Sequence, residues 1–137
     1  MAKKQIQVGV RQGAGPEPGY QWDVALLSFV FKERKFLNKE QRKHLASEVK
    51  ELARQLDPTH SDTISIDNIE DFHELRDWGG ILDDLNVRIF FGVDKKARAI
   101  VVLGVIKKKN NGATLLGDKV RMRRRWRKYL NGDYGQI

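Results

Sequence analysis

Three consecutive lysines, residues 107–109, end an apolar run that begins at Ala99. A strand fixes the position of its own last residues, so such a run would bring several ammonium groups to one place, pointing in alternating directions. Arg76 and Arg88 lie in two other strand-like segments and could present their guanidinium groups on the same face. Cations gathered in this way are suited to phosphate oxygens, which guanidinium binds through paired hydrogen bonds. For the lysines alone, the alternative is an ordinary solvated strand end.

A second basic cluster occupies residues 121–129, whose sequence is RMRRRWRKY. One interpretation is a helix face that follows a phosphate backbone through Arg121, Arg124 and Arg125. The other is a helix anchored in the core by its apolar residues, with arginines extending over its surface into solvent. We expect both to hold in part, with the aromatic residues buried and some of the arginines simply solvated.

The sequence shows no motif for metal, nucleotide or acyl-transfer chemistry. The chain has no cysteine, and its three histidines, His44, His60 and His73, do not pair at the spacing of a helical metal site. A phosphate-binding glycine loop and a serine nucleophile elbow are also missing. We therefore expect no metal and no cofactor. Whether His73 is an acid–base group or a structural residue is left open.

The overall charge favours a polyanionic partner. The 137 residues include 26 basic and 18 acidic side chains, which give a formal net charge of +8. Such an excess favours nucleic acid, because phosphate contacts release counterions. No apolar run approaches the roughly 20 residues that cross a bilayer, and the first residues lack the apolar segment of a signal peptide. We expect a soluble, cytoplasmic protein without a membrane partner.

The chain length suits one domain, which we place at residues 20–132. Residues 1–19 are rich in glycine and proline and predict a flexible arm or a short edge strand. Residues 133–137 would be a tail. No internal repeat indicates a second domain.

In the first half of the domain we predict a strand and a helix. Residues 20–31 are apolar at both odd and even positions, as in a strand that is covered on both faces. Residues 38–56 predict a helix in which Asn38 is the N-cap and Gln41 completes a capping box. Its buried face would consist of four aliphatic residues, Leu45, Val49, Leu52 and Leu56.

In the second half we predict strands at residues 72–77, 86–93 and 99–106, with a further short strand near 63–66. The last two of these strands, 86–93 and 99–106, would form a hairpin through a charged turn at residues 94–98. Asp118 would cap a last helix over residues 119–130, whose inner face would be formed by Met122, Trp126, Tyr129 and Leu130. The fold class is therefore α+β: a small, mainly antiparallel sheet of about four strands, flanked by one helix from the first half and by a basic C-terminal helix.

Several of these segments together resemble toxins of the RelE/ParE superfamily, in particular the phage-derived HigB-like branch. The resemblance covers roughly residues 72–129 and rests on the order and spacing of Glu74-Leu75-Arg76, Arg88-Ile89-Phe90-Phe91, Lys107-Lys108 and Tyr129. It implies a RelE-like fold and the toxin component of a toxin–antitoxin system. Such a toxin is a metal-independent endoribonuclease, a hydrolase that cuts mRNA, commonly on the ribosome. A cognate antitoxin, expected to be of the helix-turn-helix type, would hold it inactive.

The resemblance also assigns roles to individual residues. By position it implies that Arg76, Lys107 and Lys108 are catalytic. In this reaction a ribose 2′-hydroxyl attacks the neighbouring phosphate, so cations that stabilise charge, and a lysine whose pKa neighbouring cations lower, would assist. The residues predicted to contact nucleic acid are Arg88, Lys109, Arg121, Arg124 and Arg125, of which Arg88 has the more structural character.

One departure from the family pattern concerns the segment after the basic strand end. Many ribosome-dependent members have an aromatic residue or a histidine there, whereas NNGATLLGD has neither. Trp78 and His73 are the candidates to take its place. Two other functions therefore remain open: a non-catalytic nucleic-acid-binding or phage-derived module, and a ParE-like inhibitor of a protein target such as DNA gyrase.

Overall fold

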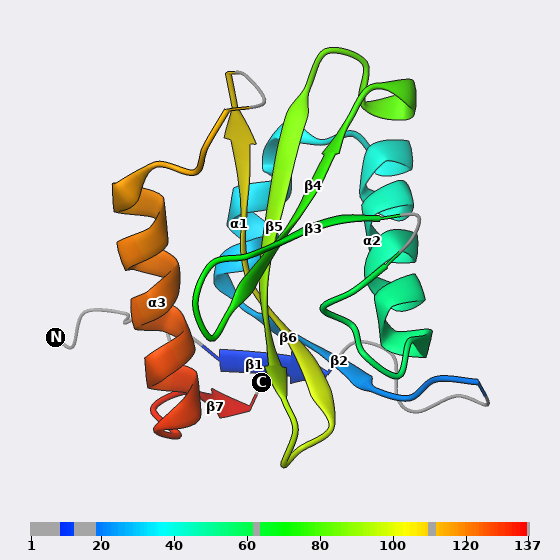
Figure 1. The fold of residues 1–137 in the computed structure, drawn as a ribbon. Coiled ribbons are helices and arrows are strands. Elements are labelled where there is room, and N and C mark those ends of the chain that lie inside the picture. Colours follow the sequence, from blue (N-terminus) through cyan, green and yellow to red (C-terminus); the bar gives the residue numbers. More distant parts are fainter. Residues whose placement is uncertain (1–8, 13–18, 62–63, 110–111, 137) are drawn as a thin grey trace, which may run out of the picture.

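The structure is a computed structural model that describes residues 9–12, 19–61, 64–109 and 112–136 (Figure 1). Its strands are β1 (Gly9–Gln12), β2 (Asp23–Leu27), β3 (Ser65–Asn68), β4 (His73–Trp78), β5 (Asn86–Asp94), β6 (Ala99–Lys108) and β7 (Gly135–Gln136). Its helices are α1 (Phe29–Glu33), α2 (Lys39–Arg54) and α3 (Leu116–Leu130), with short 3-10 turns η1 (Arg34–Phe36) and η2 (Gly80–Leu82).

All strands join in one sheet, in the order β3-β4-β5-β6-β2-β1-β7. Figure 1 shows the sheet between α2 on one side and α3 on the other. The predicted α+β architecture is confirmed, but the sheet has more strands than expected. It is also mixed, because β2 runs parallel to β6 and β1 runs parallel to β7.

The predicted strand over residues 20–31 is only partly correct. Only residues 23–27 form β2: residues 20–22 precede the strand, and Ser28 already has helical dihedral angles and begins the turn into α1. The last residue of β2 that pairs with β6 is Leu26, opposite Val102. Beyond this point α1 covers the edge of β6, and Glu33 Oε1 accepts a hydrogen bond from the amide of Val105 at 3.1 Å. A side chain therefore satisfies a backbone donor that β2 no longer reaches.

Helix α2 begins as the sequence predicts. The amide of Gln41 donates to Asn38 Oδ1 and the amide of Asn38 donates to Gln41 Oε1, both at 2.9 Å, which completes the capping box. The helix ends at Arg54, so Leu56 lies beyond it and is 82% exposed, contrary to its predicted place on the buried face. The other three residues of that face, Leu45, Val49 and Leu52, are buried against the sheet.

The predicted hairpin of β5 and β6 is present and contains one irregularity. Phe91 pairs with Val102 but Phe90 pairs with Gly104, so Leu103 is an extra residue in β6. Such a β-bulge disrupts the alternation of side chains between the two faces. Leu103 and Gly104 both face α3, since Leu103 packs in the same cluster as Met122 and a Cβ on Gly104 would lie 2.5 Å from Met122 Cε. After the bulge, each residue of β6 points to the face opposite to the one that strict alternation predicts.

Helix α3 begins at Leu116, so Asp118 lies in its first turn and is not the N-cap that we predicted. Met122 and Trp126 are buried as expected, whereas Leu130 at the end of the helix is exposed. Trp126 packs directly on Gly92 of β5, where a Cβ would lie 2.4 Å from the indole ring. Among the described residues, no helix has both the length and the apolar character needed to cross a membrane.

The predicted arm at residues 1–19 lies mostly outside the described residues. Its described strand, β1, is not an edge strand, because it pairs with β2 on one side and with β7 on the other. The predicted tail therefore takes part in the sheet through Gly135 and Gln136.

Candidate active site and nucleic-acid interface

The α3-facing side of the sheet carries several of the predicted residues. The pairing of β4 with β5 is regular and sets Arg76 opposite Arg88 and Trp78 opposite Asn86, which in turn pairs with Lys108 of β6. Paired residues share a face, so Arg76, Trp78, Arg88 and Lys108 all project toward the α3 side. Trp78 and Lys108 are two strands apart, a separation of roughly 10 Å.

A buried carboxylate organises this face. Glu74 is fully buried, and its Oε1 accepts from Arg76 Nε at 2.9 Å and from Arg88 Nη1 at 3.2 Å. Its Oε2 accepts from the hydroxyl of Thr114 at 2.5 Å. We call these four residues the Glu74 network, and we include Lys108 in it because Lys108 and Arg88 donate to the same backbone oxygen, that of Gly112. Charge-assisted hydrogen bonds of this kind are short and strong, and they fix the guanidinium groups in place.

Arg88 has a structural position in this network. It is 1% exposed, and its Nη2 donates to the backbone oxygen of Gly112 at 2.7 Å. Burial lowers its pKa, and the charge of Glu74 opposes this shift. Its guanidinium is therefore not presented to solvent, contrary to the predicted contact with nucleic acid. Arg88 instead ties β5 to the segment that follows β6.

Arg76 and Lys108 lie nearer to the surface. Arg76 is partly exposed, and its Nη2 also contacts the exposed carboxylate of Asp67 at 2.9 Å. Lys108 Nζ donates to the backbone oxygens of Gly112, at 2.9 Å, and Ala113. Partial burial, followed by the nearby Arg88 guanidinium, lowers the pKa of Lys108. Of the predicted catalytic residues, these two are brought to the same face.

Lys107 is directed to the other face of the sheet. Its ammonium lies 6.0 Å from the centre of the Phe36 ring, in the turn η1. The reason is the bulge at Leu103, which reverses the alternation before the lysines are reached. The structure therefore separates Lys107 from Arg76 and Lys108, with which we had grouped it.

Lys107 instead lines a shallow depression with Arg121 and Arg125, between the α1–η1 segment and α3. Arg125 is buried there and forms two hydrogen bonds of 2.9 Å to the carboxylate of Glu33. Its guanidinium also stacks 3.9 Å from the centre of the Phe29 ring. Arg125 thus anchors α3 to α1 and, contrary to our prediction, offers no solvated charge to a phosphate.

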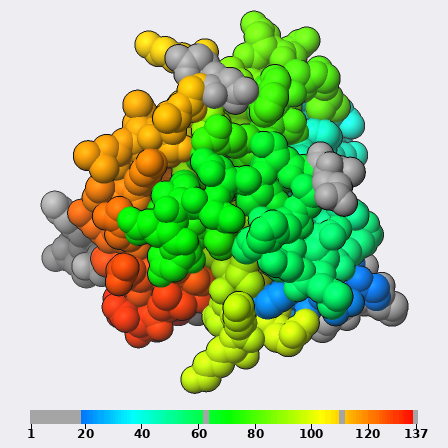
Figure 2. All heavy atoms as spheres, viewed as in Figure 1, coloured from blue at the N-terminus to red at the C-terminus, as the bar shows by residue number. Residues whose placement is uncertain are grey.

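The remaining predicted contacts are on the surface. Arg121 and Arg124 are exposed on α3, and Arg121 contacts Asp118 at 3.1 Å within the same helix. Lys109 is exposed just beyond the end of β6. On its inner side, α3 lies against the segment that contains β3 and β4, shown in green in Figure 2. Arg123 joins the two through hydrogen bonds of 2.8 and 2.6 Å to Glu70.

The two candidates for the missing aromatic or histidine differ in position. Trp78 is 49% exposed and shares the face of Arg76. His73 projects to the opposite face, with Nδ1 2.7 Å from Asn68 Oδ1, and burial lowers its pKa. The arrangement therefore favours Trp78 over His73 as a part of the same site.

The sequence analysis missed one further cluster of ionisable side chains. His44 Nε2 lies 2.8 Å from both Glu48 Oε1 and Asp77 Oδ2, and the three groups could together hold a metal ion. The spacing of four residues between His44 and Glu48 on a predicted helix was the available signal. Asp77 lies in β4, and only the tertiary structure brings its carboxylate next to His44 and Glu48.

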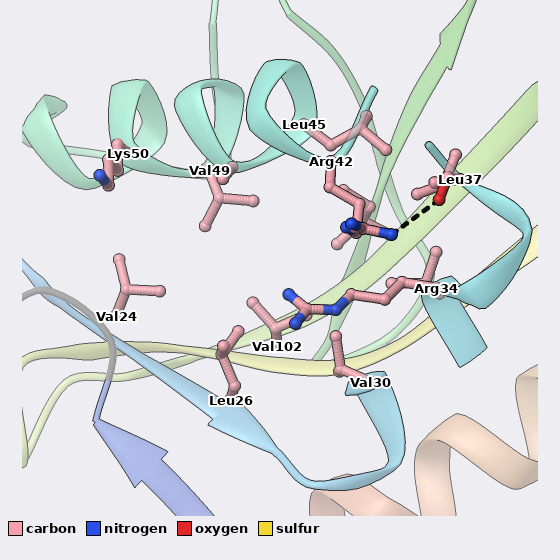
Figure 3. Close-up of a pocket in the computed structure, with 13 residues that line it drawn as sticks. Val24, Leu26, Val30, Arg34, Leu37, Arg42, Leu45, Val49, Lys50 and Val102 are labelled. Atoms are coloured by element: carbon pink, nitrogen blue, oxygen red, sulfur yellow. Dashed lines mark hydrogen bonds between the residues drawn. The ribbon is translucent and has the colours of Figure 1, made fainter. Parts of the chain in front are cut away.

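A separate apolar cavity of about 290 Å³ lies between α2 and the sheet (Figure 3). Aliphatic side chains such as Val49 and Val102 surround it, and the side chains of Arg34 and Arg42 extend into it. Arg42 Nη1 donates to the backbone oxygen of Leu37 at 2.9 Å. None of the predicted site residues lines this cavity, which distinguishes it from the Glu74 network.

No protein-family model, curated protein or solved structure matches this chain.

Proposed function

We propose that this protein is a RelE/HigB-like toxin, an endoribonuclease that cleaves mRNA without a metal ion at the scissile phosphate. The observation that carries the proposal is the placement of Arg76, Lys108 and the exposed Trp78 on one face of the sheet. These three residue types provide a phosphate ligand, a proton donor and a surface on which a base can stack.

The chemistry assigns each group a step. The 2′-hydroxyl of the ribose gives up its proton to solvent water, and its oxygen forms a bond to phosphorus while the bond from phosphorus to the 5′-oxygen breaks. Arg76 would bind the phosphate oxygens as negative charge develops on them. Protonated Lys108, whose pKa is lowered, would transfer its proton to the departing 5′-oxygen. Trp78 would hold a neighbouring base by stacking, as aromatic side chains do in single-stranded RNA recognition.

The internal contacts of Arg76 are compatible with this role. From the buried side, Glu74 Oε1 lies 2.9 Å from Arg76 Nε and 2.7 Å from Nη2, and Nη2 also contacts the exposed Asp67 at 2.9 Å. A phosphate can replace an exposed carboxylate partner, because exposed ion pairs contribute little stability. The guanidinium would then remain oriented by Glu74 while it binds substrate.

The fold is in keeping with the resemblance, which implies a sheet flanked by helices. As partners we propose mRNA, engaged on the ribosome, and a cognate antitoxin. The antitoxin would have to cover the α3-facing end of β4 and β6 to prevent access of RNA to Arg76 and Lys108.

The test is RNA cleavage by purified protein, with and without ribosomes. Arg76→Ala and Lys108→Ala should each slow cleavage by about a hundredfold or more, the scale on which one preorganised charged donor acts. Lys95→Ala is the matched control, because Lys95 is exposed in the turn at the far end of the β5–β6 hairpin. A chelator should leave the rate unchanged. Equal rates for wild type and both site variants would contradict the proposal.

A second candidate is a nucleic-acid-binding module without catalysis. It is favoured by the internal acceptors that already engage Lys108, and by the exposed cations on the outer side of α3. In this case RNA binding should weaken steeply with salt, and Arg121→Glu with Arg124→Glu should lower affinity about equally for all sequences. Strong salt-dependent binding by a wild-type protein that cleaves no RNA, with or without ribosomes, would favour this alternative.

A further inference from the structure

A second convergence of ionisable groups lies on the face of the sheet opposite to Lys108. Asp77 follows Arg76 in β4 and so projects toward α2, where it meets His44 and Glu48. The two helical residues are one turn apart on the same side of α2. Three ligand atoms, one imidazole nitrogen and two carboxylate oxygens, all lie within 4.8 Å of one another.

Rigid elements hold these atoms. Helix α2 is fixed at its start by the capping box, and Leu45 and Val49, next to the two ligands in sequence, are buried against the sheet. Asp77 Oδ1 accepts a hydrogen bond from the amide of Trp78 at 2.8 Å, which leaves Oδ2 directed at His44. The orientation of the carboxylate is thus set by its own strand. Sites built on helices and strands in this way hold ligands with higher precision than sites on loops.

The cluster is incomplete as a hydrogen-bond network. His44 Nε2 can carry a single proton, and its hydrogen bond is to Asp77. Glu48 Oε1, although 2.8 Å from the same nitrogen, is shielded from solvent and has no hydrogen-bond partner within the described part of the chain. Buried carboxylate oxygens are normally paired or coordinate a metal ion.

The two carboxylates face a single imidazole nitrogen, since Glu48 Oε1 and Asp77 Oδ2 each lie 2.8 Å from His44 Nε2. A divalent cation between the two oxygens would balance both charges.

We propose that His44, Glu48 and Asp77 form a binding site for a divalent transition-metal ion, with Zn²⁺ as the best match. Zn²⁺ accepts imidazole nitrogen and carboxylate oxygen at about 2.0–2.2 Å, and three protein ligands leave a fourth position for water. Tetrahedral ligands at such distances are roughly 3.3–3.5 Å apart. The 2.8 Å contacts would therefore have to widen by several tenths of an ångström. His44 is partly exposed, so both the ion and the water can enter.

This inference goes beyond the proposed function and does not depend on it. The ion would link α2 to β4 from the face opposite to Arg76 and Lys108, so it would stabilise the fold without contacting the scissile phosphate. An ion that binds only the folded state raises the melting temperature, and this rise grows with the logarithm of the free metal concentration.

The experiment is a calorimetric titration of metal-free, full-length protein with ZnCl₂, repeated with Co²⁺ so that its visible spectrum reports the ligands. We expect one ion per chain and a higher melting temperature in its presence. Glu48→Gln and His44→Ala should each weaken binding by on the order of a hundredfold. Glu48→Gln changes shape little and removes a carboxylate from a buried site, so it should fold.

Two variants are matched controls. Glu51→Gln changes another glutamate of α2, which pairs with Arg54 at the surface, and His60→Ala removes an exposed histidine that contacts Asp57. Neither should alter zinc affinity. The proposal is overturned if wild type binds no stoichiometric ion, if Glu48→Gln binds as tightly as wild type, or if His60→Ala weakens binding as much as His44→Ala.

Discussion

Replacement of Glu74 by leucine should destabilise the protein through the charge that it leaves behind. Glu74 is fully buried and accepts hydrogen bonds from Arg76, Arg88 and Thr114. In Glu74→Leu, Arg76 can turn toward Asp67 and solvent, because it is partly exposed. Arg88 has no such freedom, since it is 1% exposed. Its guanidinium would keep the backbone oxygen of Gly112 but lose its counter-charge.

The magnitude follows from the cost of an unpaired buried charge. Removal of one partner from a buried ion pair typically costs about 3–5 kcal/mol, whereas a domain of this kind has about 5–15 kcal/mol of stability in total. We therefore expect Glu74→Leu to lose about a fifth or more of the free energy of unfolding. The double variant Glu74→Leu/Arg88→Met removes both charges, and paired replacement of this kind is often neutral. It should recover about 2 kcal/mol or more relative to the single variant.

The assay is urea unfolding followed by tryptophan fluorescence and far-ultraviolet circular dichroism, with the slope of the transition compared between variants. Glu51→Leu is the control, because Glu51 pairs with Arg54 at the surface and exposed pairs contribute about 1 kcal/mol or less. The reasoning is refuted if Glu74→Leu costs no more than this control, or if the double variant is no more stable than the single one.

Three further results are expected. Gly92→Ala should lower the free energy of unfolding by about 1–3 kcal/mol, because its methyl group would lie 2.4 Å from the Trp126 ring. Gly117→Ala is the control, because a Cβ at this position would meet no atom within 4 Å, and it should leave the free energy of unfolding unchanged or raise it. An equal loss of stability in both variants would contradict the close packing of Trp126 on Gly92. Asn38→Ala removes the N-cap of α2 and should lower the free energy of unfolding by about 0.5–2 kcal/mol in the same assay. An unchanged midpoint of urea unfolding would show that the cap does not stabilise the protein. The rate of RNA cleavage should fall as pH rises through the pKa of Lys108, which lies below the ordinary value for lysine. Lys108→Arg keeps the positive charge but cannot release a proton, so cleavage should be slow and this fall in rate should disappear; an unchanged rate and pH profile would exclude Lys108 as the proton donor.

The sequence predicted elements whose causes are local. Asn38 and Gln41 cap α2 through contacts three residues apart, and the alternation of apolar residues in β5 needs only the strand itself. The hairpin was predictable for the same reason, because its two strands are consecutive and joined by a charged turn. Such patterns indicate structure without knowledge of what packs on it.

The candidate site was less predictable because its geometry is set between elements. The extra residue Leu103 is a property of how β6 pairs with β5, and it decides which of two adjacent lysines joins Arg76. The burial of Arg88 depends on Glu74 in another strand, and that of Arg125 depends on Glu33 in α1. A basic residue with a buried acidic partner cannot be distinguished in sequence from one that is free to bind phosphate.

The parallel pairing of β1 with β7 means that the chain could be circularly permuted while the sheet keeps its strand order. Gly9 pairs with Gly135 and Val10 pairs with Gln136, so both ends of the described chain lie side by side in the sheet. The entropic cost of closing a loop grows with its length, and the loop between β1 and β7 includes nearly the whole chain. We therefore expect this pairing to be among the last to form. A circular permutant that connects the end of β7 to the start of β1 through a linker of about a dozen residues, and opens the chain at the exposed turn of Lys95 and Lys96, should retain the sheet order. In such a molecule the most distant contact would become a local one, so the order of folding events would change while the final structure would not.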